Sequence, residues 1–285
     1  MTSKQRAWAA LTQALRDTLP AQRVQAFVGG THTASLADNL LPGLSNDEVE
    51  LVRAQLGEGD GGELVPTASG KVRAHAPYSS AALAANAFGR WLTDPQHLQL
   101  AGLASLEQVR LEDKLKINHG GGTANLDLGA YGPDLIFGVE SKLTEMLDPH
   151  EPEPWRKPYL APAMRDLLSD GWADVFDQSL AGTWTPQHLG LEQLIKHALA
   201  ITSQAGARKP HLLYLYWEPR NGFEIPEVRA HREEVKELQE TVGEASPRLY
   251  TLTYRDLFDQ WAAQPEPVWL LEHASQLRER YEIEI

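Results

Sequence analysis

The sequence predicts an α/β fold with a mixed central sheet. Apolar and polar residues alternate in three consecutive segments, 106–117, 124–131 and 135–143, which is typical of β-strands. An alanine-rich helical pattern over 78–92 precedes them, and an amphipathic one over 190–204 follows. The 285 residues are 42% hydrophobic, enough for the core of one large domain or two small ones. Helix, three strands, helix and strand in succession indicate the α/β class.

The N-terminal pattern is amphipathic. Leucine recurs every fourth residue from Leu11 to Leu19, just before Pro20, so we expect a helix over residues 1–28. This pattern differs from that of a signal peptide. No apolar stretch approaches the roughly 20 residues of a membrane span. We therefore expect a soluble, cytoplasmic protein without a membrane partner.

A second N-terminal helix is expected over 45–56, because Ser45 and Glu48 have the spacing of a capping box. We interpret residues 1–70 as a helical extension that packs on a main domain over 71–285.

The remaining elements follow from periodicity and from turn residues. The helix over 78–92 has Ser79 or Ser80 as its candidate cap. The insert 144–189 contains a proline-rich segment that we expect to be irregular. Beyond the elements above, the pattern predicts a glycine-rich loop 118–124, a buried strand 211–219, a charged helix 226–242, a strand running into a helix over 248–263, and a last helix over 268–281.

Composition limits the chemistry. The chain has no cysteine, which excludes disulfides, thiolate metal sites and cysteine nucleophiles. A metal site would have to use carboxylates, histidines or carbonyls, and such ligands suit hard cations such as Mg²⁺. The formal net charge of −13 argues against nonspecific coating of nucleic acid, which requires clustered Lys and Arg. It leaves open an enzyme with a local basic groove.

The segment "NLDLGAYGPDLIFGVESKLTE" predicts a hairpin with one charged face. Matching the apolar faces of its strands puts Asp127 on the same face as Glu140 and Lys142. A two-residue turn at 132–133 would place Asp127 opposite Gly138, and a four-residue loop would place it opposite Glu140. Either register brings the two carboxylates together.

Asp134 does not fit this cluster. It precedes Glu140 by six residues on one strand, and at ~3.3 Å per residue the separation is roughly 20 Å. Pro133 and Asp134 are common turn residues. We therefore assign Asp127, and not Asp134, as the partner of Glu140.

Two carboxylates and a lysine on one face suit metal-dependent phosphodiester hydrolysis. Adjacent carboxylates raise each other's pKa, and a divalent cation between them removes that cost. The lysine would hold the attacking water beside a metal-bound phosphate. The alternative is a solvent-exposed face on which Asp127, Glu140 and Lys142 form ordinary surface ion pairs.

These residues resemble the PD-(D/E)XK nuclease superfamily, whose fold is called restriction-endonuclease-like. In that family a helix precedes an antiparallel three-stranded meander, and a helix and a further strand follow. Glu140-Ser141-Lys142 matches the E-x-K motif on the third strand, and Asp127 matches the acidic residue on the second. The resemblance covers about residues 75–217.

The sequence pattern "SSAALAANAF…NLDLG…VESKLTE…QLIKHAL" also resembles an uncharacterised bacterial branch of this superfamily, described as restriction endonucleases. The resemblance implies that Asp127, Glu140 and the Ser141 carbonyl bind Mg²⁺, for which Mn²⁺ could substitute. It also implies that Lys142 positions water and that Gln193 and Lys196, on the following helix, support the site or contact phosphate.

The chain departs from the family pattern in several places. Leu126, and not proline, precedes Asp127, and the first helix lacks the glutamate of some members. Glu107 or Glu112 could replace that glutamate, although a solvated strand edge is the favoured interpretation of both. The insert 144–189 is also unusual.

Other candidate sites are weaker. The glycine-rich "HGGGTAN" lacks the GK[ST] ending of a phosphate loop. His197 lies four residues after Gln193 and could face the same site, although a helix-surface residue is the favoured interpretation. The eight tryptophans are interpreted as core and interface residues. The isolated basic residues are expected to be solvated, although they could line a nucleic-acid groove: Arg110, Lys114, Lys116, Arg156 and Lys157.

The sequence therefore predicts a Mg²⁺-dependent endonuclease that hydrolyses duplex or branched DNA; a restriction or defence role and a homodimeric state are further expectations. The alternative is a noncatalytic interaction protein on the same fold, which the charge of −13 and the incomplete motif favour.

Overall fold

A five-stranded mixed sheet forms the centre of the protein. The computed structural model describes the chain except for residues 26, 60, 61, 150, 152 and 153. The strand order is β1-β2-β3-β4-β5, with the first three antiparallel and the last three parallel. The predicted α/β class with a mixed sheet is confirmed. The strands are β1 Gln108–Ile117, β2 Gly122–Tyr131, β3 Leu135–Lys142, β4 Lys209–Tyr216 and β5 Arg248–Thr253.

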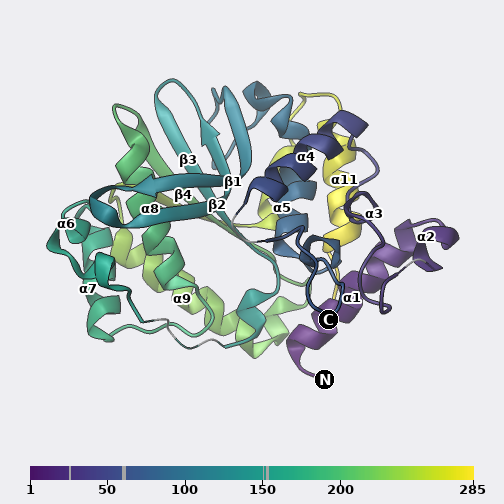
Figure 1. The fold of residues 1–285 in the computed structure, drawn as a ribbon, viewed down its shortest axis with the longest axis horizontal. Helices are drawn as coiled ribbons and strands as arrows, with labels where there is room; N and C mark the ends of the chain where they lie inside the picture. Colours follow the sequence, from purple (N-terminus) through teal and green to yellow (C-terminus); the bar gives the residue numbers. More distant parts are fainter. Residues whose placement is uncertain (26, 60–61, 150, 152–153) are drawn as a thin grey trace.

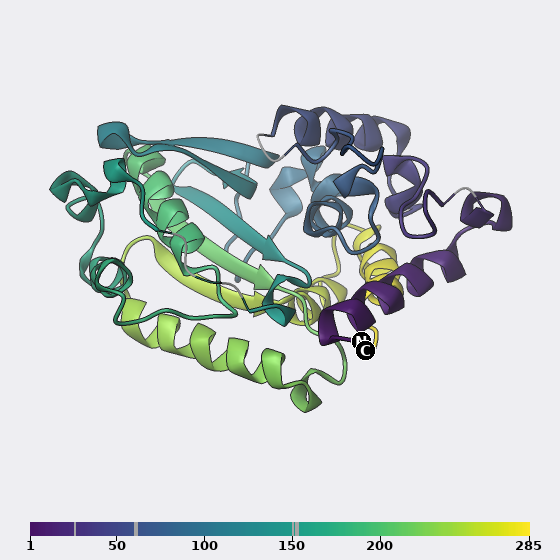
Figure 2. The ribbon, with the colours of Figure 1, turned by 60° about the horizontal axis from the view of Figure 1, so that its bottom comes forward.

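Helices cover both faces of the sheet (Figures 1 and 2). The crossovers β3–α8–β4 and β4–α9–β5 both join parallel neighbours, so right-handed connections put α8 and α9 on one face. On the other face α5 packs on the meander and α10 packs on β5. The α-helices are α1 Ser3–Thr18, α2 Ala21–Gln25, α3 Leu36–Asn39, α4 Asn46–Glu58, α5 Ser80–Phe88, α6 Pro162–Arg165, α7 Asp170–Ala181, α8 Leu191–Ala205, α9 Pro226–Val242, α10 Tyr254–Ala262 and α11 Leu270–Tyr281.

The single helix predicted over residues 1–28 is wrong. The chain leaves the helix at Leu19, whose φ of −93° and ψ of 145° are extended. Pro20 explains this break, because proline disfavours helical geometry in the residue before it and lacks an amide N–H. A second short helix follows, and residue 26 of the predicted range lies outside the described residues.

The predicted cap of α4 is confirmed. Ser45 Oγ accepts from the Glu48 amide at 3.3 Å, and Glu48 Oε2 accepts from the Ser45 amide at 2.7 Å. Ser79 caps α5 in the same way, with the Ala82 amide 3.2 Å from its Oγ. Both caps satisfy amides that a helix N-terminus leaves without a partner.

The N-terminal helices share the main core. Helix α1 packs against α11, and the chain termini lie close together (Figure 2). The Arg280 side chain is only 2% exposed and donates to Asn39 Oδ1 at 2.9 Å. Asn86 Nδ2 donates to the Tyr281 hydroxyl at 2.8 Å. The first of these buried contacts connects residues 1–70 to the C-terminal helix, and the second connects α5 to the same helix. The domain division at residue 70 stays a prediction.

Strand β1 kinks at Glu112. This residue has a φ of 49°, in the left-handed region that non-glycine residues rarely adopt. Beyond the kink, the β1–β2 hairpin leaves the sheet and lies against α8 (Figure 1). Gln204 Nε2 donates to the Lys116 carbonyl at 2.7 Å, and the Asn118 amide donates to Ser203 Oγ at 3.1 Å. The hairpin and α8 therefore form two walls beside the sheet.

The insert after β3 is more ordered than its sequence predicts. Its proline-rich part, residues 148–162, forms only short turns where the structure describes it; residues 150, 152 and 153 lie outside the description. The following helix α7 was missed, although Trp172 is fully buried and Gly182, with a φ of 65°, ends the helix as a left-handed cap. Within the described residues, none of the helices combines the length and the apolarity needed to cross a bilayer.

Candidate metal and phosphate site

Of the two predicted hairpin registers, the one with the four-residue loop is correct. Gly129 faces Gly138 and Leu128 faces Val139, and Gly132 bonds to Leu135 across a four-residue loop. Extending this register by one pair places Asp127 opposite Glu140. Asp134 is exposed at the turn, where its carbonyl accepts from the Lys209 amide. The predicted geometry is therefore confirmed: Asp127 and Glu140 lie together, and Asp134 lies elsewhere.

Strands β2 and β3 diverge at this pair. Regular pairing ends at Leu128 and Val139. Instead of joining the ladder, the Ser141 amide donates to Asp127 Oδ2 at 2.6 Å. The Lys142 carbonyl accepts from Trp217 beyond β4, so strand alternation turns the Ser141 backbone groups toward β2. The Ser141 carbonyl thus faces the side on which the Asp127 carboxylate lies.

Glu140 is buried between a lysine and a histidine. It has 0% exposure, and its Oε1 is in ion-pair contact with Lys142 Nζ. Its Oε2 lies 3.2 Å from Nδ1 of His197, a side chain that is itself 2% exposed. Among the described residues, neither carboxylate oxygen has a hydrogen-bond partner of good geometry. Glu140 is therefore a buried carboxyl group whose oxygens have unused capacity to accept or coordinate.

Burial and mutual repulsion dominate the electrostatics. Burial first, and then the neighbouring Glu140, raise the pKa of Asp127 well above its usual value. Burial also raises the pKa of Glu140, while Lys142 lowers it in part. Burial disfavours the Lys142 ammonium, but Glu140, Glu145 and Asp127 outweigh it, so the pKa of Lys142 lies above its usual value. The lysine is therefore charged, and the carboxylates compete for one proton or cation.

Burial lowers the pKa of His197 to about 3, and Lys142 adds to the effect. The ring is therefore neutral at physiological pH and can donate from only one nitrogen. The prediction of a helix-surface histidine is wrong, because His197 lies on the buried side of α8. Its position four residues after Gln193 is the sequence signal for a shared face.

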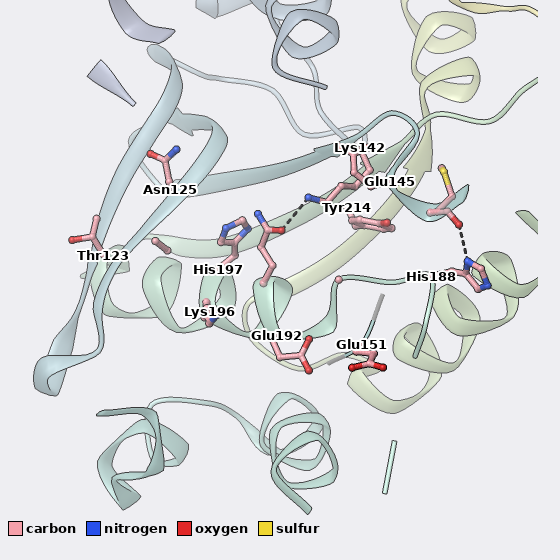
Figure 3. Close-up of a pocket in the computed structure, with 14 residues that line it drawn as sticks. Thr123, Asn125, Lys142, Glu145, Glu151, His188, Glu192, Lys196, His197 and Tyr214 are labelled. Carbon is pink, nitrogen blue, oxygen red and sulfur yellow. Dashed lines mark hydrogen bonds between the residues drawn. The ribbon is translucent and has the colours of Figure 1, made fainter. Parts of the chain in front are cut away.

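The two residues predicted on α8 have different positions. Gln193 Oε1 accepts from Lys142 Nζ at 3.0 Å, so it orients the lysine (Figure 3). Lys196 does not reach the carboxylates. Its ammonium lies 5.6 Å from the centre of the Trp155 ring and 5.8 Å from that of Tyr159, at the mouth of the site.

A cavity of about 420 Å³ opens over these residues. The β1–β2 hairpin contributes Thr123 and Asn125 on one side, and α8 contributes Lys196 on another (Figure 3). Gln193 of α8 also lines the cavity. Lys142 and His197 line the cavity, whereas Asp127 and Glu140 do not. A phosphate entering the cavity would meet Lys142 first.

Two further acids belong to this neighbourhood. Glu112 was expected at a solvated edge, but it is 8% exposed and accepts from Asn125 Nδ2. Burial, with Asp127 second, raises its pKa to about 7. The β1–β2 register places it opposite Asp127, a relation that fixing this register from the sequence would have shown. Glu145, three residues after Lys142, lines the cavity and was not predicted.

The oxygen donors of this site suit a hard cation. Asp127, Glu140 and the Ser141 carbonyl offer oxygen ligands, which Mg²⁺ prefers. In the described part of the chain, no three His, Asp or Glu side chains are arranged to bind a metal ion. The unused Glu140 oxygens fit a cation that takes two carboxylates, one carbonyl and water, as Mg²⁺ commonly does.

A mixed sheet flanked by helices, with two carboxylates and a lysine where two strands diverge, defines a protein of restriction-endonuclease-like architecture. The chain belongs to the family described as restriction endonuclease associating with ARP, whose model matches residues 52–282. That match begins in α4 and includes all five strands. No curated protein and no solved structure shows significant similarity to the chain.

Proposed function

We propose that the protein is a Mg²⁺-dependent endonuclease of the PD-(D/E)XK type that hydrolyses DNA phosphodiester bonds. One observation carries the proposal: the diverging ends of β2 and β3 hold Asp127, Glu140 and Lys142 within one contact network. Family membership supports a restriction-endonuclease relative. Divergence of the strands matters because it frees the Ser141 backbone and the Asp127 carboxylate from the ladder.

In this proposal Asp127, Glu140 and the Ser141 carbonyl hold the cation. When bound, Mg²⁺ polarises the phosphate and lowers the pKa of a bound water. The fold shields Glu140 from solvent and orients Asp127 through the hydrogen bond that its carboxylate accepts from the Ser141 amide. Burial raises the pKa values of these acids, so they hold protons more tightly when no cation is bound. A cation that binds them displaces those protons, so cation binding and deprotonation are coupled.

Lys142 acts on the substrate side. An ammonium group has three donors and no acceptor, so it cannot ligate a metal. Gln193 fixes one donor at 3.0 Å, and the Nζ atom faces the cavity. There it holds the attacking water and offsets charge that develops on the phosphate. Its raised pKa keeps the positive charge in place while these events occur.

His197 contacts Glu140 from the cavity side. A proton on Nδ1 would let the neutral ring donate to Glu140 Oε2 across the observed 3.2 Å. Such an outer contact orients a ligating carboxylate without adding charge. We assign His197 as a positioning residue.

The proposal is tested by incubating the purified protein with supercoiled plasmid DNA, with Mg²⁺ or with excess chelator. Nicked or linear product should form only with the cation. No product with Mg²⁺ or Mn²⁺, on plasmid, branched or single-stranded DNA, would favour the noncatalytic interaction protein.

A further inference from the structure

Four hollows, one of them the cavity of the candidate site, are linked through lining residues that they share. The central cavity shares Glu192 with a second hollow of about 450 Å³ beside the insert. On another side it shares Glu145 with a third hollow of about 300 Å³ beside α1. Figure 3 shows Glu192 and Glu145 at different sides of the central cavity. The third hollow continues into a fourth, of about 420 Å³, because Trp8 and Tyr78 line both. We call the four together the trough.

Aromatic side chains and cations flank the centre of the trough on both sides. Beside the insert, Trp155 lines the second hollow, with the Lys196 ammonium 5.6 Å from its ring centre. Beside α1, the Trp8 and Tyr78 rings stack with centroids 4.5 Å apart, and Lys4 Nζ lies 5.5 Å from the Trp8 ring. The largest buried tryptophans are four others: Trp91, Trp172, Trp217 and Trp261. Trp8 and Trp155 are only half-buried, and Trp155 also packs against the core.

The stacked Trp8–Tyr78 pair is connected to the candidate site. Trp8 Nε1 donates to Thr144 Oγ1 at 3.1 Å, and Thr144 precedes Glu145. Lys4 Nζ also bonds to Asp148 at 3.0 Å, in the same segment. Helix α1 therefore holds the chain that follows Lys142, although α1 lies outside the residues that the family model matches.

We propose that the trough binds one single strand of nucleic acid, with its scissile phosphate at Lys142 and its flanking bases at Trp155 and at the Trp8–Tyr78 pair. This inference rests on the proposed nuclease function and specifies its substrate class. Each hollow has the volume of a small-ligand site, which suits one nucleotide at a time. Alternating cations and aromatic rings along a groove are the pattern by which proteins hold single strands regardless of sequence.

The charges of the trough also favour a single strand over a rigid duplex. Glu192 and Glu145 lie where the central cavity meets the second and the third hollow, and the chain has a net charge of −13. A duplex carries about one charge per 1.7 Å and requires a broad basic surface. A single strand can place its phosphates near Lys4, Lys142 and Lys196 while its bases contribute uncharged stacking. Because Glu145 and Glu192 would repel the phosphates, we expect divalent cations to strengthen this binding.

The test measures binding by fluorescence anisotropy, with labelled oligothymidine of about 16 nucleotides and a labelled duplex as probes. The background is Lys142→Met with Mg²⁺, so that cleavage is suppressed. Trp8→Leu and Trp155→Leu should each weaken oligothymidine binding about 5- to 100-fold, the loss of one stacked base. Trp8→Phe and Trp155→Phe, which keep an aromatic face, should restore most of it. Phe223→Leu, at a side chain that is 62% exposed and outside the trough, is the matched control and should change nothing.

Thermal melts establish that each variant is folded. Unchanged affinity in both folded leucine variants would overturn the trough, as would tighter binding of the duplex than of the single strand. Equal losses in the Phe and Leu variants of Trp8 would also overturn stacking there, since both remove the hydrogen bond to Thr144. Plasmid cleavage without any effect of the trough variants refutes only the trough. Oligothymidine binding with these losses, but without cleavage of any substrate, supports the trough and refutes the nuclease.

Discussion

Replacement of Lys142 separates catalysis from structure. Methionine retains much of the side-chain volume and removes the charge. Loss of one electrostatic group that acts on a transition state costs about 10²–10³ in rate, or about 2.7–4 kcal/mol. Lys142→Met should therefore lose that factor in single-turnover plasmid cleavage at saturating Mg²⁺.

The structure adds a stability effect to this prediction. The Lys142 side chain is 16% exposed and that of Glu140 is 1% exposed, so their pair is not a surface ion pair. Removal of one partner of a buried pair leaves an uncompensated charge and costs about 3–5 kcal/mol. Without cation, Lys142→Met should melt well below wild type. Mg²⁺ should recover much of the difference, because it replaces the lost counter-charge at Glu140.

Lys236→Met on α9 is the control, since that side chain is 66% exposed and pairs with Glu240 at 3.8 Å. It should change neither the rate nor the melting temperature measurably. An unchanged cleavage rate in Lys142→Met would refute the catalytic role. A normal rate together with a lower melting temperature would show that the lysine serves structure alone.

Three other outcomes are expected. Mg²⁺ should raise the melting temperature of wild type, and Asp127→Asn should abolish this shift; an equal shift in both, seen by differential scanning fluorimetry, would place the cation elsewhere. Because the pKa of Glu112 is raised to about 7 from 4.5, the folded state binds more protons than the unfolded state between these values, so stability is greatest below about pH 4.5 and falls as pH rises to about 7. Glu112→Gln should flatten this slope and gain up to about 3 kcal/mol at pH 8 relative to pH 4.5, measured by urea unfolding, whereas an unaltered slope would contradict it. Gly138→Ala should cost about 1–3 kcal/mol in the same assay, because its methyl group would lie 2.5 Å from Ile201 Cδ1 of α8 and force repacking; no cost would contradict the packing of α8 on β3.

The sequence predicts most of the secondary structure because periodicity and caps are local signals. Helix α9 spans the predicted residues, and the capping box of α4 is present. The break at Pro20 was also readable, since the residue before proline avoids the helical region. Helix α7 was missed because the prolines before it suggested an irregular insert, whereas tertiary burial of Trp172 stabilises the helix.

For the candidate site, alternation alone identified the pair Asp127 and Glu140, because one face of each strand had to be apolar. The full burial of Glu140 could not be predicted, since it depends on the hairpin and α8 closing over β3. The kink at Glu112 reverses the expectation for that residue. Local alternation assumes a regular strand, so it cannot place a side chain where the backbone turns left-handed.

The most direct test of the central claim compares two aspartates that stand seven residues apart. Cleavage of supercoiled plasmid is measured with Mg²⁺ for wild type, Asp127→Asn and Asp134→Asn. Both substitutions remove one carboxylate charge, but only Asp127 lies beside Glu140, and Asp134 is exposed at the turn. The Asp127 variant should lose cleavage while remaining folded, and the Asp134 variant should cleave at the wild-type rate. Cleavage that survives Asp127→Asn, or that Asp134→Asn abolishes equally, would contradict the assignment of the site.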